Sequence, residues 1–243
     1  MRVLILSDIH ANRVALEAVL ADASGYEAVW CLGDLVGYGP DPNECVEQVR
    51  SLPQLTCLVG NHDKAVLGEV DLGVFNFDAS LALRWTRKAV SEETLDYLRR
   101  LPEWEQFGEF TLVHGSPREP VWEYILDRFI ARENFPLFKT AYCLVGHTHT
   151  PVIYRETVPS GDCLEEPPSY ARPRALNGQR LIINPGSVGQ PRDSNPQAAY
   201  ALLDTEALVW EHRRVPYDVL ETQRRMRAAQ LPERLVQRLA LGW

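Results

Sequence analysis

The stretch that decides the fold is residues 2–34, RVLILSDIHANRVALEAVLADASGYEAVWCLGD. Its apolar run at 2–7 predicts a buried strand. Asn12 can cap the helix that follows, whose apolar side chains recur at helical spacing. A second apolar run, at 28–32, predicts another strand. The stretch therefore predicts a β-α-β unit.

The same alternation continues beyond this stretch. Pro42 stands where a helix can begin, residues 43–51 continue it, and residues 55–59 form a third apolar run. In such a β-α-β-α-β arrangement, the loops that leave the carboxyl ends of the strands gather along one edge of the sheet, where ligands usually bind. We therefore expect the polar residues that follow these strands to meet.

Five of the six histidines fall inside short motifs at this predicted edge. The motifs are Asp8-Ile9-His10, Gly60-Asn61-His62-Asp63, Val113-His114-Gly115 and Gly146-His147-Thr148-His149, with Gly33-Asp34 between the first two. The last two motifs follow the apolar runs 110–113 and 142–145, which predict two more strands. Histidine nitrogens, carboxylates and an Asn amide form the mixed ligand set that zinc, manganese or iron accept. No Cys belongs to the set, which argues against a structural zinc knot.

The remaining segments predict helices, a flap and a hairpin. Residues 64–102 are expected to be mostly helical, with a helix beginning after Ser91, and to form a cap over the site. Residues 156–180 are polar and contain four prolines, which predicts a long surface flap or hairpin. Residues 198–213 predict two strands that turn at Asp204 and Thr205. Residues 217–240 predict a helical segment with Leu231, Leu235 and Leu239 on one stripe.

Composition limits the class of protein. The chain has 243 residues, is 45% hydrophobic and carries a formal net charge of -8. Such a chain can bury a full core, so we expect one domain over residues 1–243. The acidic balance argues against extended nucleic acid or an anionic membrane as a partner. A small phosphorylated substrate remains compatible, because metal ions supply positive charge locally.

The cysteines and the apolar runs predict the compartment. The five cysteines include no CxxC pair, and an odd number cannot close into a disulfide framework. A reducing cytoplasm fits best. The apolar run at the N-terminus is too short for a signal-peptide core, and no run approaches the length of a membrane span. The sequence leaves the oligomeric state open.

Taken in order, the blocks DxH, GDLVGYG, GNHD, VHG and GHTHTP resemble the calcineurin-like metallophosphoesterase superfamily. The match runs from residue 8 to residue 192, and the NPGSVGQPRD block at 184–193 is similar to a late block of the small stand-alone bacterial and archaeal members. The resemblance implies an α/β fold, a four-layer α-β-β-α sandwich with two central mixed β-sheets. It also implies a two-metal site at one edge of the sheets.

The resemblance further implies a role for each motif residue. One metal would be held by Asp8, His10 and His149, and the second by Asn61, His114 and His147, with Asp34 bridging them. His62 would be the catalytic general acid, for which a near-neutral pKa is expected, and metal-bound hydroxide would be the nucleophile. Manganese is the metal we expect first, while iron, zinc, cobalt and nickel also suit this ligand set.

The same resemblance limits the class of substrate. Protein phosphatases of this superfamily carry an Asp-Arg pair where this chain has Gly37-Tyr38, which argues against a phosphoprotein substrate. We expect the substrate to be a small phosphodiester or phosphoanhydride derived from a nucleotide. Tyr38, Arg118 and Arg192 are candidate substrate contacts, with solvated surface arginine an equal alternative for the two arginines. A broad phosphomonoesterase and a non-catalytic scaffold are the two alternative functions.

Other polar and aromatic residues are expected to have structural roles. Asp63 is expected to cap the turn that follows it rather than to orient His62. His212 lies outside every motif and is expected to be structural. The tryptophans are expected to pack in the core or cap, although Trp85 or Phe75 could stack on a base.

Overall fold

The computed structural model of the chain describes residues 1–157 and 161–243. Residues 158–160, which include Pro159 of the predicted flap, lie outside the described residues. Within the described part, no helix combines the length and the apolar character that crossing a membrane requires.

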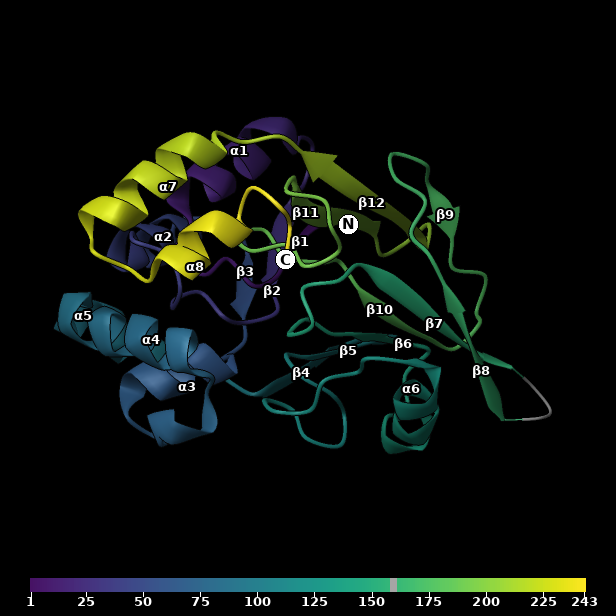
Figure 1. Cartoon of the computed structure of the whole chain (residues 1–243). Coiled ribbons are helices and arrows are strands. Elements are labelled where there is room, and N and C mark those ends of the chain that lie inside the picture. Colours follow the sequence, from purple (N-terminus) through teal and green to yellow (C-terminus); the bar gives the residue numbers. More distant parts are fainter. Residues whose placement is uncertain (158–160) are drawn as a thin grey trace.

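Two β-sheets of six strands each, counted over the described residues, form the centre of the molecule (Figure 1). The first has the order β3 (Leu55–Cys57), β2 (Ala28–Cys31), β1 (Arg2–Leu6), β11 (Ala198–Asp204), β12 (Val209–Val215) and β9 (Arg174–Ala175). The second has the order β4 (Trp104–Phe107), β5 (Phe110–Val113), β6 (Tyr142–Leu144), β10 (Leu181–Asn184), β7 (Val152–Thr157) and β8 (Asp162–Glu166). Both sheets are mixed: β1 pairs parallel with β2 and antiparallel with β11, while β10 pairs parallel with β6 and antiparallel with β7.

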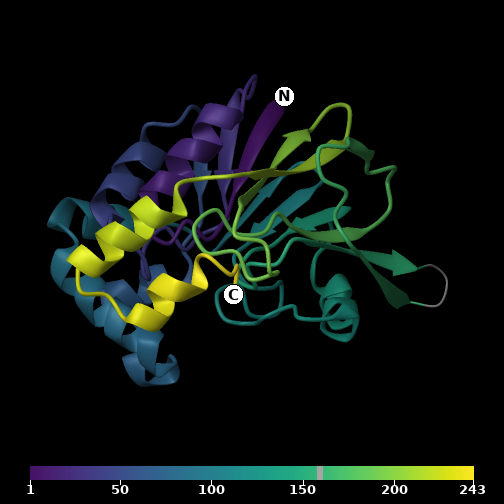
Figure 2. The ribbon, with the colours of Figure 1, turned by 45° about the horizontal axis from the view of Figure 1, so that its top comes forward.

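Helices cover the outer faces of the two sheets (Figures 1 and 2). The α-helices are α1 (Arg13–Asp22), α2 (Pro42–Arg50), α3 (Asn61–Leu67), α4 (Phe77–Ala89), α5 (Glu92–Leu98), α6 (Arg128–Asn134), α7 (Val219–Ala228) and α8 (Glu233–Arg238). Two 3₁₀ turns, η1 (Leu72–Val74) and η2 (Phe135–Leu137), join them. Asn12 caps α1 as predicted, since its side chain accepts a hydrogen bond from the Ala15 amide at 3.2 Å.

The alternation of side chains along each strand explains the layers. In β1, Leu4 and Leu6 face the cluster that contains α1 and α2, whereas Val3 and Ile5 face the cluster between the two sheets. In β6, Cys143 faces the cluster that contains α6. Strands buried on both faces need a partner layer on each side. The predicted four-layer α-β-β-α sandwich is therefore confirmed.

Most predicted elements are present, with shifted ends. The flap contains the antiparallel β7–β8 pair, and residues 198–213 contain the paired strands β11 and β12. The prediction of one helical segment over 217–240 needs a correction, because the chain turns at Ala229 and Gln230 and forms two helices. A proline in the middle of a helix removes a backbone hydrogen bond, so α8 begins just after Pro232. The leucine stripe is buried together with Tyr38 and residues of α4, which places α8 beside α4.

Candidate metal centre

All seven predicted metal ligands follow strand ends at one edge of the two sheets. Asp8 and His10 follow β1, Asp34 follows β2, Asn61 begins α3 after β3, His114 follows β5, and His147 and His149 follow β6. Each of the seven side chains is at most 3% exposed. The β-α-β expectation that these loops converge is met, since both sheets contribute to one buried group.

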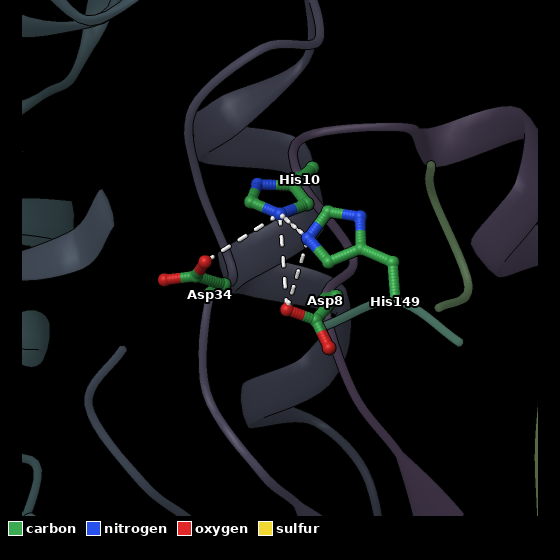
Figure 3. Close-up of side chains that lie close together, drawn as sticks. All are labelled: Asp8, His10, Asp34 and His149. Atoms are coloured by element: carbon green, nitrogen blue, oxygen red, sulfur yellow. Dashed lines mark hydrogen bonds and ion pairs between the residues drawn. The ribbon is translucent and has the colours of Figure 1, made fainter. Parts of the chain in front are cut away.

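The first half of this group is formed by Asp8, His10, Asp34 and His149 (Figure 3). Their ligand atoms all lie within 4.8 Å of one another. His10 Nε2 lies 3.0 Å from His149 Nε2 and 3.5 Å from Asp34 Oδ2. His149 Nε2 lies 3.3 Å from Asp8 Oδ1.

The second half contains Asn61, His114 and His147 and shares Asp34 with the first. His114 Nε2 lies 3.2 Å from Asn61 Oδ1, 3.2 Å from His147 Nδ1 and 3.5 Å from Asp34 Oδ2. One carboxylate oxygen, Asp34 Oδ2, therefore faces histidines of both halves.

The outward nitrogen of each histidine contacts a backbone carbonyl. His10 Nδ1 lies 3.1 Å from Val36 O, and His149 Nδ1 lies 2.6 Å from Gln190 O. The corresponding partners of His114 and His147 are Leu32 O at 2.8 Å and Trp122 O at 3.2 Å. A carbonyl only accepts, so these nitrogens carry the proton and a neutral ring turns a lone pair inward. Two facing lone pairs at 3.0 Å repel unless a proton or a cation lies between them.

Hydrogen bonds also fix the carboxylates of Asp8 and Asp34. Asp8 Oδ2 accepts from Ser7 Oγ at 2.6 Å and from the His147 amide at 3.1 Å, and Asp34 Oδ1 accepts from the His62 amide at 2.9 Å. Within the described residues, the other oxygens, Asp8 Oδ1 and Asp34 Oδ2, are buried without a hydrogen-bond partner. Such buried orphan oxygens are costly, and a cation would satisfy them. The donor set of imidazole nitrogen, carboxylate and amide oxygen fits divalent transition metals.

The backbone at this edge is held in an uncommon conformation. Asp8, His10, Asp34, His147 and His149 have φ between 49° and 65°. Residues with side chains rarely adopt this left-handed region, and such strain is typical of functional sites that the surrounding structure stabilises.

Burial and charge set the pKa values of the histidines. Burial lowers the pKa of His10 and of His147 well below 6.5, and it lowers that of His149. These three rings are therefore neutral at pH 7, as metal ligation requires. Burial also acts to lower the pKa of His114, but the Asp34 carboxylate outweighs it and raises the value to about 9. A proton and a cation therefore compete for His114 Nε2.

A cavity of about 270 Å³ opens beside this group. It is lined by Tyr38, Asn61, His62, Val74, Phe75, Asn76, Trp122, Tyr124, His147, Arg192 and Arg238. Of the described residues in the predicted cap segment 64–102, Val74, Phe75 and Asn76 reach this cavity. Tyr38 and Arg192 line it as expected of substrate contacts, and Arg192 NH2 lies 3.3 Å from Tyr38 Oη.

His62 lies in an aromatic surround at the wall of this cavity. Its ring centroid lies 4.8 Å from that of His10, 4.4 Å from that of Tyr38 and 5.2 Å from that of Phe75. Burial lowers the pKa of His62 to about 4, and the charge of Arg192 acts in the same direction. The expected near-neutral pKa is therefore wrong for this ring as it stands, because a buried imidazolium loses its hydration.

Arg118 does not reach the cavity, in contrast to the expectation. Its guanidinium, about two-fifths exposed, pairs with Glu123 and with Glu133, 2.7 Å away. Glu123 also accepts hydrogen bonds from Ser116 Oγ at 2.6 Å and Asn134 Nδ2 at 2.8 Å. Arg118 therefore belongs to a polar network that ties the loop after β5 to α6.

His212 has a structural place, as expected, whereas Asp63 does not cap the turn that follows it but bonds to residues that precede it. Asp63 accepts from the amides of Gly60 at 2.9 Å and Val36 at 3.1 Å. His212 accepts from Trp210 Nε1 at 3.0 Å and lies 2.9 Å from Asn184 O. Neither side chain lines the cavity.

Three cavity residues lie outside both the predicted site and the predicted cap segment: Trp122, Tyr124 and Arg238. Tyr124 stacks on the ring of His147, with centroids 3.6 Å apart. Trp122 and Tyr124 stand in the loop just after the Val113-His114-Gly115 motif, so two aromatic side chains there were a signal for the cavity wall. Arg238 stands in the last helix, where no motif marks it.

Comparison with known proteins identifies the family. The profile of the calcineurin-like phosphoesterase superfamily domain matches residues 1–208. The crystal structure of a metallophosphoesterase from Sphaerobacter thermophilus shares 48% sequence identity, covers 100% of both chains and has a TM-score of 0.92. An uncharacterized protein of Methanocaldococcus jannaschii is 38% identical over 98% of this chain and 97% of the relative. Phosphodiesterase YfcE of Escherichia coli is 26% identical over 86% of this chain and 90% of the relative. With most of its length matched by the family profile, the chain belongs to the calcineurin-like phosphoesterase superfamily.

Proposed function

We propose that this protein is a two-metal phosphoesterase that hydrolyses small phosphodiesters or phosphoanhydrides derived from nucleotides. The observation that carries the proposal is the shared carboxylate oxygen Asp34 Oδ2, which lies 3.5 Å from His10 Nε2 on one side and 3.5 Å from His114 Nε2 on the other. A carboxylate between two sets of nitrogen donors is suited to bridge two cations. The family membership and the phosphodiesterase activity in the name of the YfcE relative support the same reaction class.

In this proposal, Asp8, His10 and His149 hold one divalent ion, and Asn61, His114 and His147 hold the other. Manganese is our first choice, with iron, zinc, cobalt and nickel also compatible with the donors. When bound, such a pair polarises the phosphoryl group and lowers the pKa of a coordinated water. The backbone carbonyls behind the histidines keep the ring orientations fixed.

The cavity residues act on the substrate. His62 stands beside the ligands and would donate to a phosphoryl oxygen and then to the leaving oxygen. A phosphate dianion or diester in the cavity opposes the effect of burial on His62, since negative charge favours the imidazolium. Tyr38 and Arg192 would contact the substrate, and the faces of Phe75, Trp122 and Tyr124 suit an aromatic base.

The test compares Asp34→Asn with the unchanged protein. We expect about two manganese ions per chain in the unchanged protein and fewer in Asp34→Asn, measured by mass spectrometry of the metals. We expect kcat/KM on bis-p-nitrophenyl phosphate to fall about a thousandfold, because metal ions supply several kcal/mol of transition-state stabilisation. Asp22→Asn is the matched control, since Asp22 lies at the exposed end of α1 and accepts a hydrogen bond from Tyr200.

A substrate panel separates the alternatives. With manganese, the protein is assayed on p-nitrophenyl phosphate, bis-p-nitrophenyl phosphate, 2′,3′-cyclic nucleotides and diadenosine tetraphosphate. A dominant rate on p-nitrophenyl phosphate would replace the diesterase with a phosphomonoesterase. A protein that binds no metal and that His62→Ala leaves unchanged in every assay would be a scaffold.

The cytoplasm remains our proposed location. All five cysteines are free and buried, which fits a reducing compartment.

A further inference from the structure

A second, larger cavity adjoins the one beside the metal centre. It measures about 520 Å³ and is lined by Asn76, Phe77, Asp78, Arg234, Leu235, Gln237, Arg238, Leu241 and Trp243. Asn76 and Arg238 line both cavities, so the two meet at these residues. We call the larger one the outer cavity. Its lining residues come from the start of α4, from α8 and from the last residues of the chain.

Arg238 stands where the cavities meet, and Arg192 lines the cavity beside the metal centre. The Arg192 guanidinium lies over the ring of Tyr38, 5.7 Å from its centroid, and its NH2 group donates to Gln190 Oε1 at 3.0 Å. Arg192 Nε is buried and, among the described residues, has no hydrogen-bond partner. Arg238 donates through Nε to the carbonyl of Trp243.

Among the described residues, the charge of Arg192 has no acidic partner, whereas Arg238 has the main-chain oxygen of Trp243, the last residue of the sequence, as its partner. Over the described residues, neither is paired with an Asp or Glu side chain, whereas Arg118 pairs with two glutamates. Burial lowers the pKa of Arg238 to about 10, and the charge of Arg192 acts in the same direction. The backbone amide of Arg192 donates to the carbonyl of the metal-ligand candidate His149 at 3.3 Å, which places Arg192 beside the metal centre. In a chain of net charge -8, two neighbouring half-buried cations favour an anion between them.

Part of the wall of the outer cavity consists of exposed apolar side chains, next to the polar and charged residues Asn76, Asp78, Arg234 and Gln237. Phe77 is 76% exposed, Trp243 60% and Leu241 46%. Large apolar side chains gathered at a cavity suit an apolar or aromatic group of a ligand.

We propose that Arg192 and Arg238 bind a second anionic group of the substrate, and that the outer cavity receives the aromatic group beyond it. The substrate class is thus a phosphate compound with one phosphoryl group at the metal centre, a further phosphate beside it and a base or other ring at the far end. This inference rests on the proposed function for the reaction at the first phosphoryl group. Arg238 lies beyond residues 1–208, the part that the family profile matches.

The test uses Arg238→Gln and two substrates, with manganese present. Bis-p-nitrophenyl phosphate has one phosphate, and diadenosine tetraphosphate has additional phosphates and a distant base. We expect kcat/KM for diadenosine tetraphosphate to fall at least about tenfold more than kcat/KM for bis-p-nitrophenyl phosphate, as for a lost hydrogen bond to a charged group. Arg224→Gln is the control, because Arg224 on α7 lines neither cavity and pairs on the surface with Glu221, 2.7 Å away. An equal fall for both substrates, or no fall for either, overturns the inference.

A binding measurement separates this inference from the proposed function. Calorimetric titration with pyrophosphate and with inorganic phosphate needs no turnover. We expect Arg238→Gln to raise the Kd for pyrophosphate by a factor at least about ten times larger than the factor by which it raises the Kd for inorganic phosphate. If this holds while no substrate is hydrolysed, the second anion site stands and the proposed function fails. If hydrolysis is seen but the Kd values for the two anions rise by the same factor, the proposed function stands and the second anion site fails.

Discussion

At the scale of single residues, Gly37 packs directly against the ring of His62. A Cβ atom at position 37 would lie 2.5 Å from His62 Nδ1, a distance that real Cβ contacts do not reach. Across the described chain, Nδ1 of His62 has no hydrogen-bond partner, so no side chain at position 37 supports it. The glycine leaves the ring room between Tyr38 and Phe75.

Gly37→Ala therefore displaces His62. We expect kcat on bis-p-nitrophenyl phosphate to fall about a hundredfold, since a small misplacement of a catalytic group has an effect of this size. Gly37 has φ +87°, and Gly68 has φ +84° with nothing within 4 Å of an added Cβ. Gly68→Ala thus has the same backbone strain without the collision and should keep its activity. Equal activity of the two variants would mean that Gly37 does not position His62.

His212 gives stability a pH dependence that is independent of the metal centre. Burial lowers its pKa to about 4, below the value near 6.5 of the unfolded chain. Between these values the unfolded chain binds the proton and the folded one does not, so folding stability is present above pH 6.5 and is lost as the pH falls toward 4.

His212→Gln should remove this pH dependence, because Gln can accept from Trp210 and donate to Asn184 O. Urea unfolding in chelator at pH 7 and pH 5 measures it. The unchanged protein is expected to lose about 2 kcal/mol more than the variant over this interval. Parallel losses would show that His212 is protonated in the folded state.

At the scale of elements, the loop after β5 presents Trp122 and Tyr124 to the cavity. The Glu123 network fixes this loop from behind, since Ser116, Arg118 and Asn134 all bond to that carboxylate. Arg118 is thus placed to fix this loop, and it does not line the cavity.

Arg118 and Arg192 were equal candidates for substrate contacts on the sequence alone. Their substitution should now have different effects on activity. Arg118→Gln is expected to change kcat/KM on bis-p-nitrophenyl phosphate less than about threefold, because exposed ion pairs contribute little. Arg192→Gln is expected to lower kcat/KM on diadenosine tetraphosphate about tenfold or more, whereas Arg118→Gln should change that value less than about threefold as well. Steady-state kinetics of both variants decide this, and a larger effect at Arg118 would contradict the assignment.

The sequence predicted elements best where one local pattern determined them. Asn12 and Ser91 cap α1 and α5, because a cap depends on residues within one turn. The division of the C-terminal segment into α7 and α8 was missed, since the leucine stripe continues past Pro232 and only packing against α4 shows the bend.

At the scale of the whole molecule, the motif residues of the site were predictable because strand order determines where strand ends meet. Asp8 and His147 are far apart in sequence, yet the His147 amide donates to Asp8 Oδ2 at 3.1 Å. Trp122 and Arg238 reach the cavity through a loop network and through helix packing. Such tertiary contacts leave no periodic trace in the sequence.

The metal centre joins both sheets, so its occupancy should affect the stability of the entire fold. Asp8 and Asp34 come from the first sheet, and His114 and His147 from the second. An ion that binds the folded chain alone adds stability by mass action, about 2.7 kcal/mol at a hundred times its Kd. We expect EDTA to lower the urea midpoint in one cooperative step, and manganese to restore it in proportion to the logarithm of its concentration. Asp34→Asn should respond much less to manganese, since it loses the shared ligand. A full response in that variant would place the stabilising ion elsewhere on the molecule.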